Sequence, residues 1–240
     1  MTSVAALVGR ARAVVFDKDG TLTDLDARWL PFFESFIDAV TQRVDERTLA
    51  GSLRSILGVT AEGLVPELPA AVETGPHIRR LVTDELVDRG VSATDADAIV
   101  TAAESSARPG ALTPLGGVAA TIGRLAADGR LIGIATSDGR TNTVVELGTL
   151  GVLDLVDALR CGDDEGPVKP DPAVLLGLAE AWGLTPADLL YVGDSHHDLQ
   201  TARAAGVPFI AVGRPDRPAW SPDAGDARVT TIDELVATPR

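Results

Sequence analysis

The chain has 240 residues, of which 45% are hydrophobic, and a formal net charge of −14 at pH 7. This length is sufficient for one large core and a smaller second unit. The negative charge disfavours nucleic acid and anionic lipid as partners, because both would be repelled. Cys161 is the only cysteine, no apolar run approaches the ~18 residues of a membrane span, and the first residues lack the apolar core of an export signal. We therefore expect a cytoplasmic protein with no nucleic-acid or membrane partner.

Short apolar runs predict the strands of a parallel sheet. The first run, residues 12–17, ends on a carboxylate and is followed by the turn-prone Gly20 and Thr21. Similar runs recur at residues 131–136, 189–193 and 207–212. Helices are expected between these runs, at residues 116–128, 141–149, 171–182 and 198–205. A surface loop over residues 214–226 and a last strand and helix over residues 228–236 complete the chain. This alternation predicts an α/β domain with a doubly wound, Rossmann-like parallel sheet.

The alternation of strand and helix stops between Leu25 and Pro114, where no convincing buried strand is found. Apolar residues instead recur at helical spacing, in an aromatic group at Trp29, Phe32, Phe33 and Phe36 and across residues 76–89 and 94–107. We interpret this interval as a helical insertion whose own core contains the aromatic group. Because ligands of open α/β sheets bind at the carboxyl ends of the strands, the insertion should act as a cap. The predicted domains are a core of residues 1–24 and 110–240 and an α-helical cap of residues 25–109.

Polar residues suited to phosphate chemistry follow the predicted strands. Because the carboxyl ends of parallel strands meet at one edge of a sheet, these residues should share a cleft. The candidate site residues are Asp17, Asp19, Thr136, Ser137, Lys169, Asp194 and Asp198.

Several carboxylates in one cleft repel one another unless a cation lies among them, and oxygen ligands in this number suit Mg²⁺. We therefore predict a magnesium cofactor. With Mg²⁺ and Lys169 neutralising phosphate oxygens, Asp17 could attack phosphorus in line. Asp19 is placed to protonate the leaving oxygen and later to activate water. Thr136 and Ser137, with nearby backbone amides, would hold the phosphate.

In their order along the chain, these residues resemble the four motifs of the haloacid dehalogenase superfamily of hydrolases, in its phosphoglycolate phosphatase-like branch with a helical cap. The motifs read Asp17-Lys18-Asp19-Gly20-Thr21-Leu22, the hydroxyl of Thr136, Lys169-Pro170-Asp171-Pro172 and Gly193-Asp194-Ser195-His196-His197-Asp198. The resemblance covers residues 12–24 and 110–213, and the insertion resembles the family only in position and helical character.

The resemblance implies a phosphatase that hydrolyses a small phosphate monoester through an aspartyl phosphate. Asp17 would be the nucleophile and Asp19 the acid/base. Mg²⁺ would be held by Asp17, the main-chain carbonyl of Asp19 and Asp194, with Asp198 assisting directly or through water. Thr136 and Lys169 would bind the phosphate of a small phosphorylated metabolite.

The two lysines, Asp138 and Cys161 are residues whose roles the motifs alone do not decide. Lys18 and Lys169 are the only lysines among 21 basic residues, which hints at a role that arginine cannot fill. If strand alternation continues past the first strand, Lys18 faces away from its neighbours and is structural or exposed. Asp138 places a negative charge where many relatives carry an amide or a lysine, so the phosphate contacts beyond Thr136 stay open. Cys161 has no visible catalytic partner and is expected to be inert.

Several other functions use similar residues. A phosphomutase of the β-phosphoglucomutase type would share Asp17 and Asp19, and the sequence does not exclude it. A phospho-receiver signalling module uses similar residues in a different chain order, and a silent binding module is disfavoured because every required group is present. Dehalogenases lack a carboxylate at the position of Asp19, and phosphonatases need a cap lysine that residues 25–110 do not contain. The substrate, the protein partners and the oligomeric state are left open.

Overall fold

The computed structural model describes residues 2–44, 46–65, 67–213 and 226–236. The chain divides into two compact units, one made of Met1–Asp24 and Pro114–Arg240 and the other of Leu25–Thr113. The surface loop expected over residues 214–226 lies outside the described residues, apart from Asp226. Within the described ranges, no helix is both long enough and apolar enough to cross a membrane.

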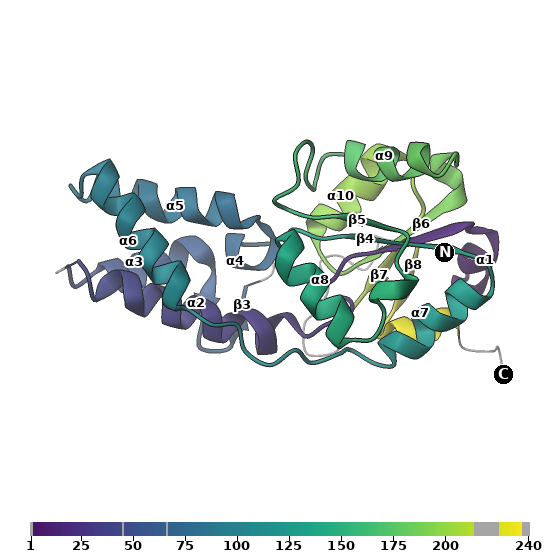
Figure 1. Ribbon diagram of the computed structural model, residues 1–240, viewed down its shortest axis with the longest axis horizontal. Coiled ribbons are helices and arrows are strands. Elements are labelled where there is room, and N and C mark those ends of the chain that lie inside the picture. The colour runs from purple at the N-terminus through teal and green to yellow at the C-terminus, as the bar shows by residue number, and fades with distance from the viewer. Residues whose placement is uncertain (1, 45, 66, 214–225, 237–240) are drawn as a thin grey trace. The chain divides into compact units, whose positions relative to one another are not determined.

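The first unit is built on a six-stranded parallel sheet (Figure 1). Its strands are β1 (Ala13–Phe16), β4 (Leu131–Ala135), β5 (Ala158–Arg160), β6 (Leu189–Gly193), β7 (Phe209–Val212) and β8 (Ala227–Val229). Their order in the sheet is β5-β4-β1-β6-β7-β8, and every neighbouring pair is parallel. The chain adds strands first on one side of β1 and then on the other. The carboxyl ends of β4, β1 and β6 therefore lie side by side, and the predicted doubly wound α/β fold is confirmed.

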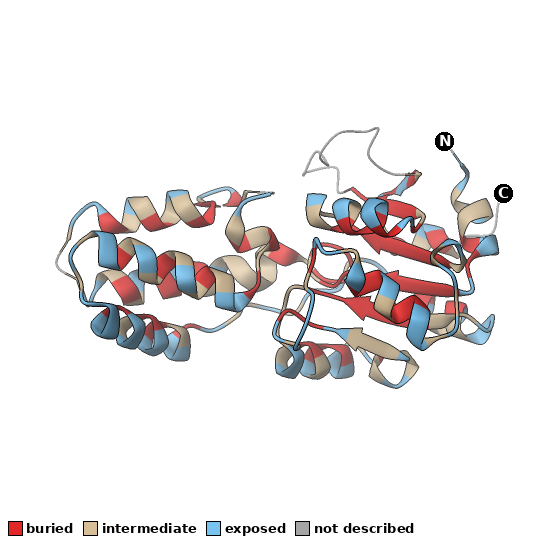
Figure 2. Cartoon of the chain, turned by 90° about the horizontal axis from the view of Figure 1, so that it is seen from above, coloured by how far each residue is buried: buried red, intermediate tan, exposed pale blue. Residues whose placement is uncertain are grey.

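Helices cover both faces of this sheet. They are α1 (Val4–Arg10), α7 (Val118–Ala127), α8 (Arg140–Thr149), α9 (Ala173–Ala181) and α10 (His196–Ala205), with the short turns η1 (Leu153–Leu155), η2 (Pro186–Asp188) and η3 (Ile232–Leu235). Alternate side chains of β1 enter two different cores. Val14 and Phe16 pack with α1, α7 and α8, whereas Ala13 and Val15 pack with α9 and α10. In Figure 2 the central strands form a layer coloured as buried, whereas the edge strand β5 is not buried. The four helices predicted for this unit between residues 116 and 205 form within two residues of their expected bounds.

One strand and one α-helix of the first unit are not predicted from the sequence. The strand β5 has three residues at the edge of the sheet, and none of them is fully buried. It therefore lacks the apolar run that marks the central strands. The helix α1 has seven residues and buries only Val8. Its start is fixed by Ser3, whose hydroxyl accepts the N–H of Ala6 at 3.2 Å.

The second unit is mainly helical. It contains α2 (Leu25–Thr41), α3 (Leu49–Leu57), α4 (Pro69–Val72), α5 (Gly75–Asp88) and α6 (Ala93–Ser106), with a short antiparallel pair β2 (Val59–Thr60) and β3 (Gly63–Leu64). Apolar residues at helical spacing form its core, as in Leu49, Leu53 and Leu57 of α3. Phe33 and Phe36 are buried in this core, and the rest of the aromatic group packs against it, as expected. The expectation that this interval holds no buried strand is wrong, because a hairpin of two-residue strands is too short to leave a pattern.

Candidate active site

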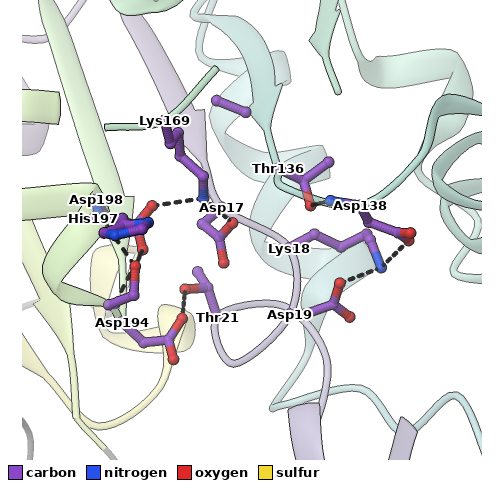
Figure 3. Close-up of polar contacts among 12 residues, drawn as sticks. Asp17, Lys18, Asp19, Thr21, Thr136, Asp138, Lys169, Asp194, His197 and Asp198 are labelled. Carbon is purple, nitrogen blue, oxygen red and sulfur yellow. Dashed lines mark hydrogen bonds and ion pairs between the residues drawn. The ribbon is translucent and has the colours of Figure 1, made fainter. Parts of the chain in front are cut away.

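A polar residue follows each of the three central strands, and the backbone ladder of the sheet holds the first two of them. Asp17 follows β1, and its N–H donates to the carbonyl of Val192 in β6 at 2.8 Å. Thr136 follows β4, and its N–H donates to the carbonyl of Arg160 at 2.9 Å. Asp194 follows β6. The sheet therefore presents these polar side chains at one edge, as Figure 3 shows.

Lys169 joins two carboxylates of this edge. Its Nζ lies 2.6 Å from Asp17 Oδ1 and 2.8 Å from Asp198 Oδ1, and all three residues are buried. Burial lowers the pKa of the Lys169 ammonium, but the charges of Asp17 and Asp198 outweigh this effect and hold that pKa above its ordinary value. Lys169 is therefore a fixed cation beside Asp17.

Asp198 is saturated with hydrogen-bond donors. Its Oδ1 accepts from Lys169 and from the hydroxyl of Tyr191, the latter at 2.5 Å. Its Oδ2 accepts the N–H and the hydroxyl of Ser195, at 3.0 and 2.6 Å. A carboxylate offers about four lone-pair positions, and these four donors use that capacity. Burial raises the pKa of Asp198, but Lys169 and the hydrogen bonds outweigh it and hold that pKa below its ordinary value. Asp198 is thus an anion that orients Lys169.

The glycines of the motifs make room for the carboxylates. Gly20 has φ +95°, and a Cβ at this position would lie 2.0 Å from Asp194 Oδ2. A Cβ at Gly193 would lie 2.6 Å from the carboxyl carbon of Asp198. Asp194 is held in turn by the hydroxyl of Thr21, which donates to its Oδ1 at 2.9 Å. Only glycine meets both the conformation and the space available at position 20.

The carboxylates of this edge fit a divalent cation. Oxygen atoms of Asp17, Asp194 and Asp198 all lie within 4.8 Å of one another. Burial, reinforced by neighbouring carboxylates, raises the pKa of Asp17 to about 7 and that of Asp194 well above its ordinary value, although Lys169 opposes the shift. One ammonium does not balance three carboxylates, and hard oxygen donors of this kind suit Mg²⁺. The side chain of Asp19 is not part of this group.

Asp19 is instead paired with Lys18. The Nζ of Lys18 lies 2.6 Å from Asp19 Oδ2 and 3.1 Å from Asp138 Oδ2, and it also contacts Glu146 Oε2. Lys18 is fully buried and contacts Asp19, so the expectations that it faces away from its neighbours and that it is exposed are wrong, whereas the alternative of a structural role fits its burial. The reason is that β1 ends at Phe16, and strand alternation does not continue to position 18. Burial lowers the pKa of Lys18, but the three carboxylates outweigh it and hold that pKa above its ordinary value.

The loop between β4 and α8 carries the predicted phosphate-binding residues. The hydroxyl of Thr136 accepts the N–H of Asp138 at 3.1 Å, and Ser137, which is half-buried, lies between these two residues in the chain. Asp138 accepts the N–H of Gly139 at 2.7 Å and the side-chain amide of Asn142 at 2.9 Å, in addition to pairing with Lys18. Burial raises the pKa of Asp138. The negative charge at this position is therefore directed to Lys18 and to the start of α8.

Sequence reasoning misses three features of this site. Tyr191 is the only tyrosine in the chain, but nothing in a buried strand marks it as a partner of Asp198. Thr21 lies within the first motif, yet its bond to Asp194 crosses 173 positions of sequence. The cluster around Lys18 is indicated in the sequence only by the scarcity of lysine. Both lysines are buried among carboxylates.

Comparison with known proteins confirms the family that the sequence resembles. Residues 11–206 match the family of haloacid dehalogenase-like hydrolases. The phosphoglycolate phosphatase of Salmonella typhi is 30% identical over 210 residues, which cover 84% of this chain and 81% of that protein.

Two solved structures share the fold. The HAD phosphatase from Thermococcus onnurineus has a TM-score of 0.65 at 22% identity and covers 93% of this chain and 95% of its own. The putative β-phosphoglucomutase from Thermotoga maritima has a TM-score of 0.63 at 20% identity, with coverages of 94% and 96%. At these identities the structures establish the fold alone. The sequence matches also establish the family, and the chain belongs to the haloacid dehalogenase-like hydrolase family of enzymes.

Proposed function

We propose that this protein is a Mg²⁺-dependent phosphatase that hydrolyses a small phosphate monoester through an aspartyl phosphate on Asp17. The observation that carries the proposal is the pairing of Asp17 with Lys169 at 2.6 Å, in a group of carboxylates that also contains Asp194. This arrangement combines a nucleophile, a fixed cation and oxygen donors for a metal. A relative named phosphoglycolate phosphatase makes phosphoglycolate the first candidate substrate.

The proposed reaction has two halves. In the first, an oxygen of Asp17 bonds to phosphorus while the ester bond breaks, and the carboxyl group of Asp19 gives its proton to the leaving oxygen. In the second, a water oxygen bonds to phosphorus and its proton passes to Asp19. The bond between Asp17 and phosphorus then breaks and releases inorganic phosphate. Asp19 thus returns to its protonated form after each turnover.

The remaining residues bind the phosphate and hold the catalytic groups. Two of the three N–H groups of Lys169 go to carboxylates, which leaves the third for a phosphate oxygen. The hydroxyl of Thr136 accepts from a backbone N–H, so its own hydrogen can donate to the phosphate. Ser137 and nearby amides complete the binding site. Asp198 acts through Lys169, because its oxygens already accept four hydrogen bonds.

The metal would be held by Asp17, Asp194 and the main-chain carbonyl of Asp19. A bound Mg²⁺ would neutralise charge on the phosphate oxygens. We further propose that the helical unit, Leu25–Thr113, acts as a cap that excludes bulk water during the reaction. A small phosphorylated metabolite would be the partner of such a site.

The test is phosphate release from a panel of small phosphate monoesters, with Mg²⁺ or with EDTA. We expect at least one ester to be hydrolysed with Mg²⁺, and hydrolysis to be lost with EDTA and in Asp17→Asn and Asp19→Asn. The exposed Asp128 provides the matched control, since Asp128→Asn makes the same chemical change before β4, whereas Thr136 follows the carboxyl end of that strand. Retained turnover in Asp17→Asn would contradict the proposal. Isomerised sugar phosphate without phosphate release would favour a phosphomutase.

A further inference from the structure

Lys18 is a buried charged group for which the proposed reaction has no use. Its side chain is fully buried, so it does not reach a substrate. An ammonium group has three N–H donors, and the Nζ of Lys18 has three carboxylate partners, Asp19, Asp138 and Glu146. Each donor can therefore be directed to one carboxylate, which fixes the ammonium in place.

We propose that Lys18 is a positioning residue that fixes the carboxyl group of Asp19, with Asp138 and Glu146 as its anchors. This inference rests on the proposed function, in which Asp19 is the acid/base. Figure 3 shows Lys18 extending between Asp19 and Asp138.

The two anchors are themselves held by α8. Glu146 lies within this helix and is buried. Asp138 precedes the helix and accepts the N–H of Gly139 and the side-chain amide of Asn142. Lys18 therefore links Asp19, in the loop after β1, to residues whose positions are fixed by α8. Without such a contact, a loop carboxylate would sample several rotamers.

Both carboxylate oxygens of Asp19 have a partner. Lys18 contacts its Oδ2 at 2.6 Å, and the hydroxyl of Thr23 donates to its Oδ1 at 3.0 Å. The hydroxyl of Thr23 also lies 3.3 Å from the carbonyl of Lys18. One charged and one neutral contact thus define the orientation of the carboxyl plane. The charged contact is the stronger of the two, so its loss should release Asp19.

Lysine suits this position better than arginine. Its ammonium is a compact charge with three donors, whereas a guanidinium is planar and carries five donors in a fixed fork. Three carboxylates around a single Nζ match the first geometry. This accounts for one of the two lysines in a chain whose other basic residues are arginine.

The test compares two variants that differ only at position 18. Lys18→Met alone would leave three carboxylates without a cation and could prevent folding. The triple variant Lys18→Met, Asp138→Asn, Glu146→Gln removes the excess negative charge together with the lysine. The control is the double variant Asp138→Asn, Glu146→Gln, which keeps Lys18 beside Asp19.

Both variants are assayed with phenyl phosphate and with dinitrophenyl phosphate. The two esters differ in how much their leaving oxygen needs a proton, and kcat/KM reports the steps up to release of that group. General acid catalysis contributes roughly 10²- to 10⁴-fold, so a misplaced Asp19 should cost a part of this factor. Relative to the double variant, we expect kcat/KM of the triple variant to fall about 30-fold for phenyl phosphate but less than about threefold for dinitrophenyl phosphate. An equal loss for both esters, or no loss for either, overturns the proposal.

Crystal structures of the two variants give a readout that does not depend on activity. We expect the carboxyl group of Asp19 to keep one orientation in the double variant and to turn away from it, or to occupy several orientations, in the triple variant. An unchanged Asp19 in the triple variant overturns the proposal. If the native enzyme hydrolyses neither ester, the crystal structures alone decide the role of Lys18, whereas the proposed function fails only if no ester of the panel is hydrolysed.

Discussion

Replacing Gly20 by alanine tests whether the position of Asp194 controls catalysis. A Cβ at position 20 would lie 2.0 Å from Asp194 Oδ2, whereas ordinary contacts begin near 3.4 Å. The carboxylate of Asp194, which accepts a hydrogen bond from Thr21, must therefore retreat by more than an ångström. Misplacing a catalytic group by ~1 Å can slow a reaction roughly 10²-fold. We expect kcat/KM to fall by about that factor and the Mg²⁺ requirement to rise.

The variant Gly129→Ala is the control for backbone strain alone. Gly129 follows α7 with φ +82°, and a Cβ there would meet nothing within 4 Å. Both variants force alanine into a left-handed conformation, which costs roughly 1–2 kcal/mol. Only Gly20→Ala also displaces a carboxylate of the site.

The assay measures phosphate release over a range of Mg²⁺ concentrations, together with urea denaturation of each variant. We expect both variants to lose unfolding free energy, Gly20→Ala at least as much as Gly129→Ala, and a large loss of kcat/KM in Gly20→Ala alone. If Gly20→Ala stays within about threefold of Gly129→Ala in kcat/KM and in Mg²⁺ requirement, the reasoning from the geometry of Asp194 is refuted.

Two further predictions concern Tyr191 and Cys161. Tyr191→Phe removes a hydrogen bond to the carboxylate of Asp198, and bonds to charged groups stabilise by about 1.5–3 kcal/mol, so the free energy of unfolding should fall by about 2 kcal/mol. Denaturation curves that coincide with those of the native protein would speak against this. Burial raises the pKa of the Cys161 thiol to about 11. Because the thiolate is the reactive form, iodoacetamide should label native Cys161 at pH 8 at least about 100-fold more slowly than in the unfolded chain, and faster as the pH rises towards 11. Equal rates in the native and unfolded states at pH 8 would show that the thiol is not buried.

The central part of the fold could be predicted because its elements leave long patterns in the sequence. The strand β6 is five apolar or small residues in a row, and all are buried. The helix α7 repeats apolar residues at helical spacing on one face. Short elements leave no such pattern. The strand β5 has three partly exposed residues, and the strands β2 and β3 have two residues each. Their formation depends on the neighbouring strands with which they pair.

The candidate site could be predicted as far as the ends of the strands. Parallel strands bring Asp17, Thr136 and Asp194 to one edge whatever their loops do. The direction of a side chain in a loop does not follow from this rule. Lys18 lies two residues past the end of β1, where the alternation of a strand no longer applies. The bond between Tyr191 and Asp198 likewise depends on how the loop before α10 turns.

The most direct test of the account asks whether the phosphoryl group passes through Asp17. Native enzyme and Asp19→Asn are mixed with Mg²⁺ and dinitrophenyl phosphate, quenched in acid within milliseconds, and digested for mass spectrometry. The account predicts a phosphoryl group on the peptide that contains Asp17. The account also predicts more phosphorylated Asp17 in Asp19→Asn than in the native enzyme. Dinitrophenyl phosphate needs no acid to phosphorylate Asp17, but hydrolysis of the aspartyl phosphate still needs Asp19 as the base. Release of phosphate without any labelled Asp17, or a label on another residue, would contradict the account.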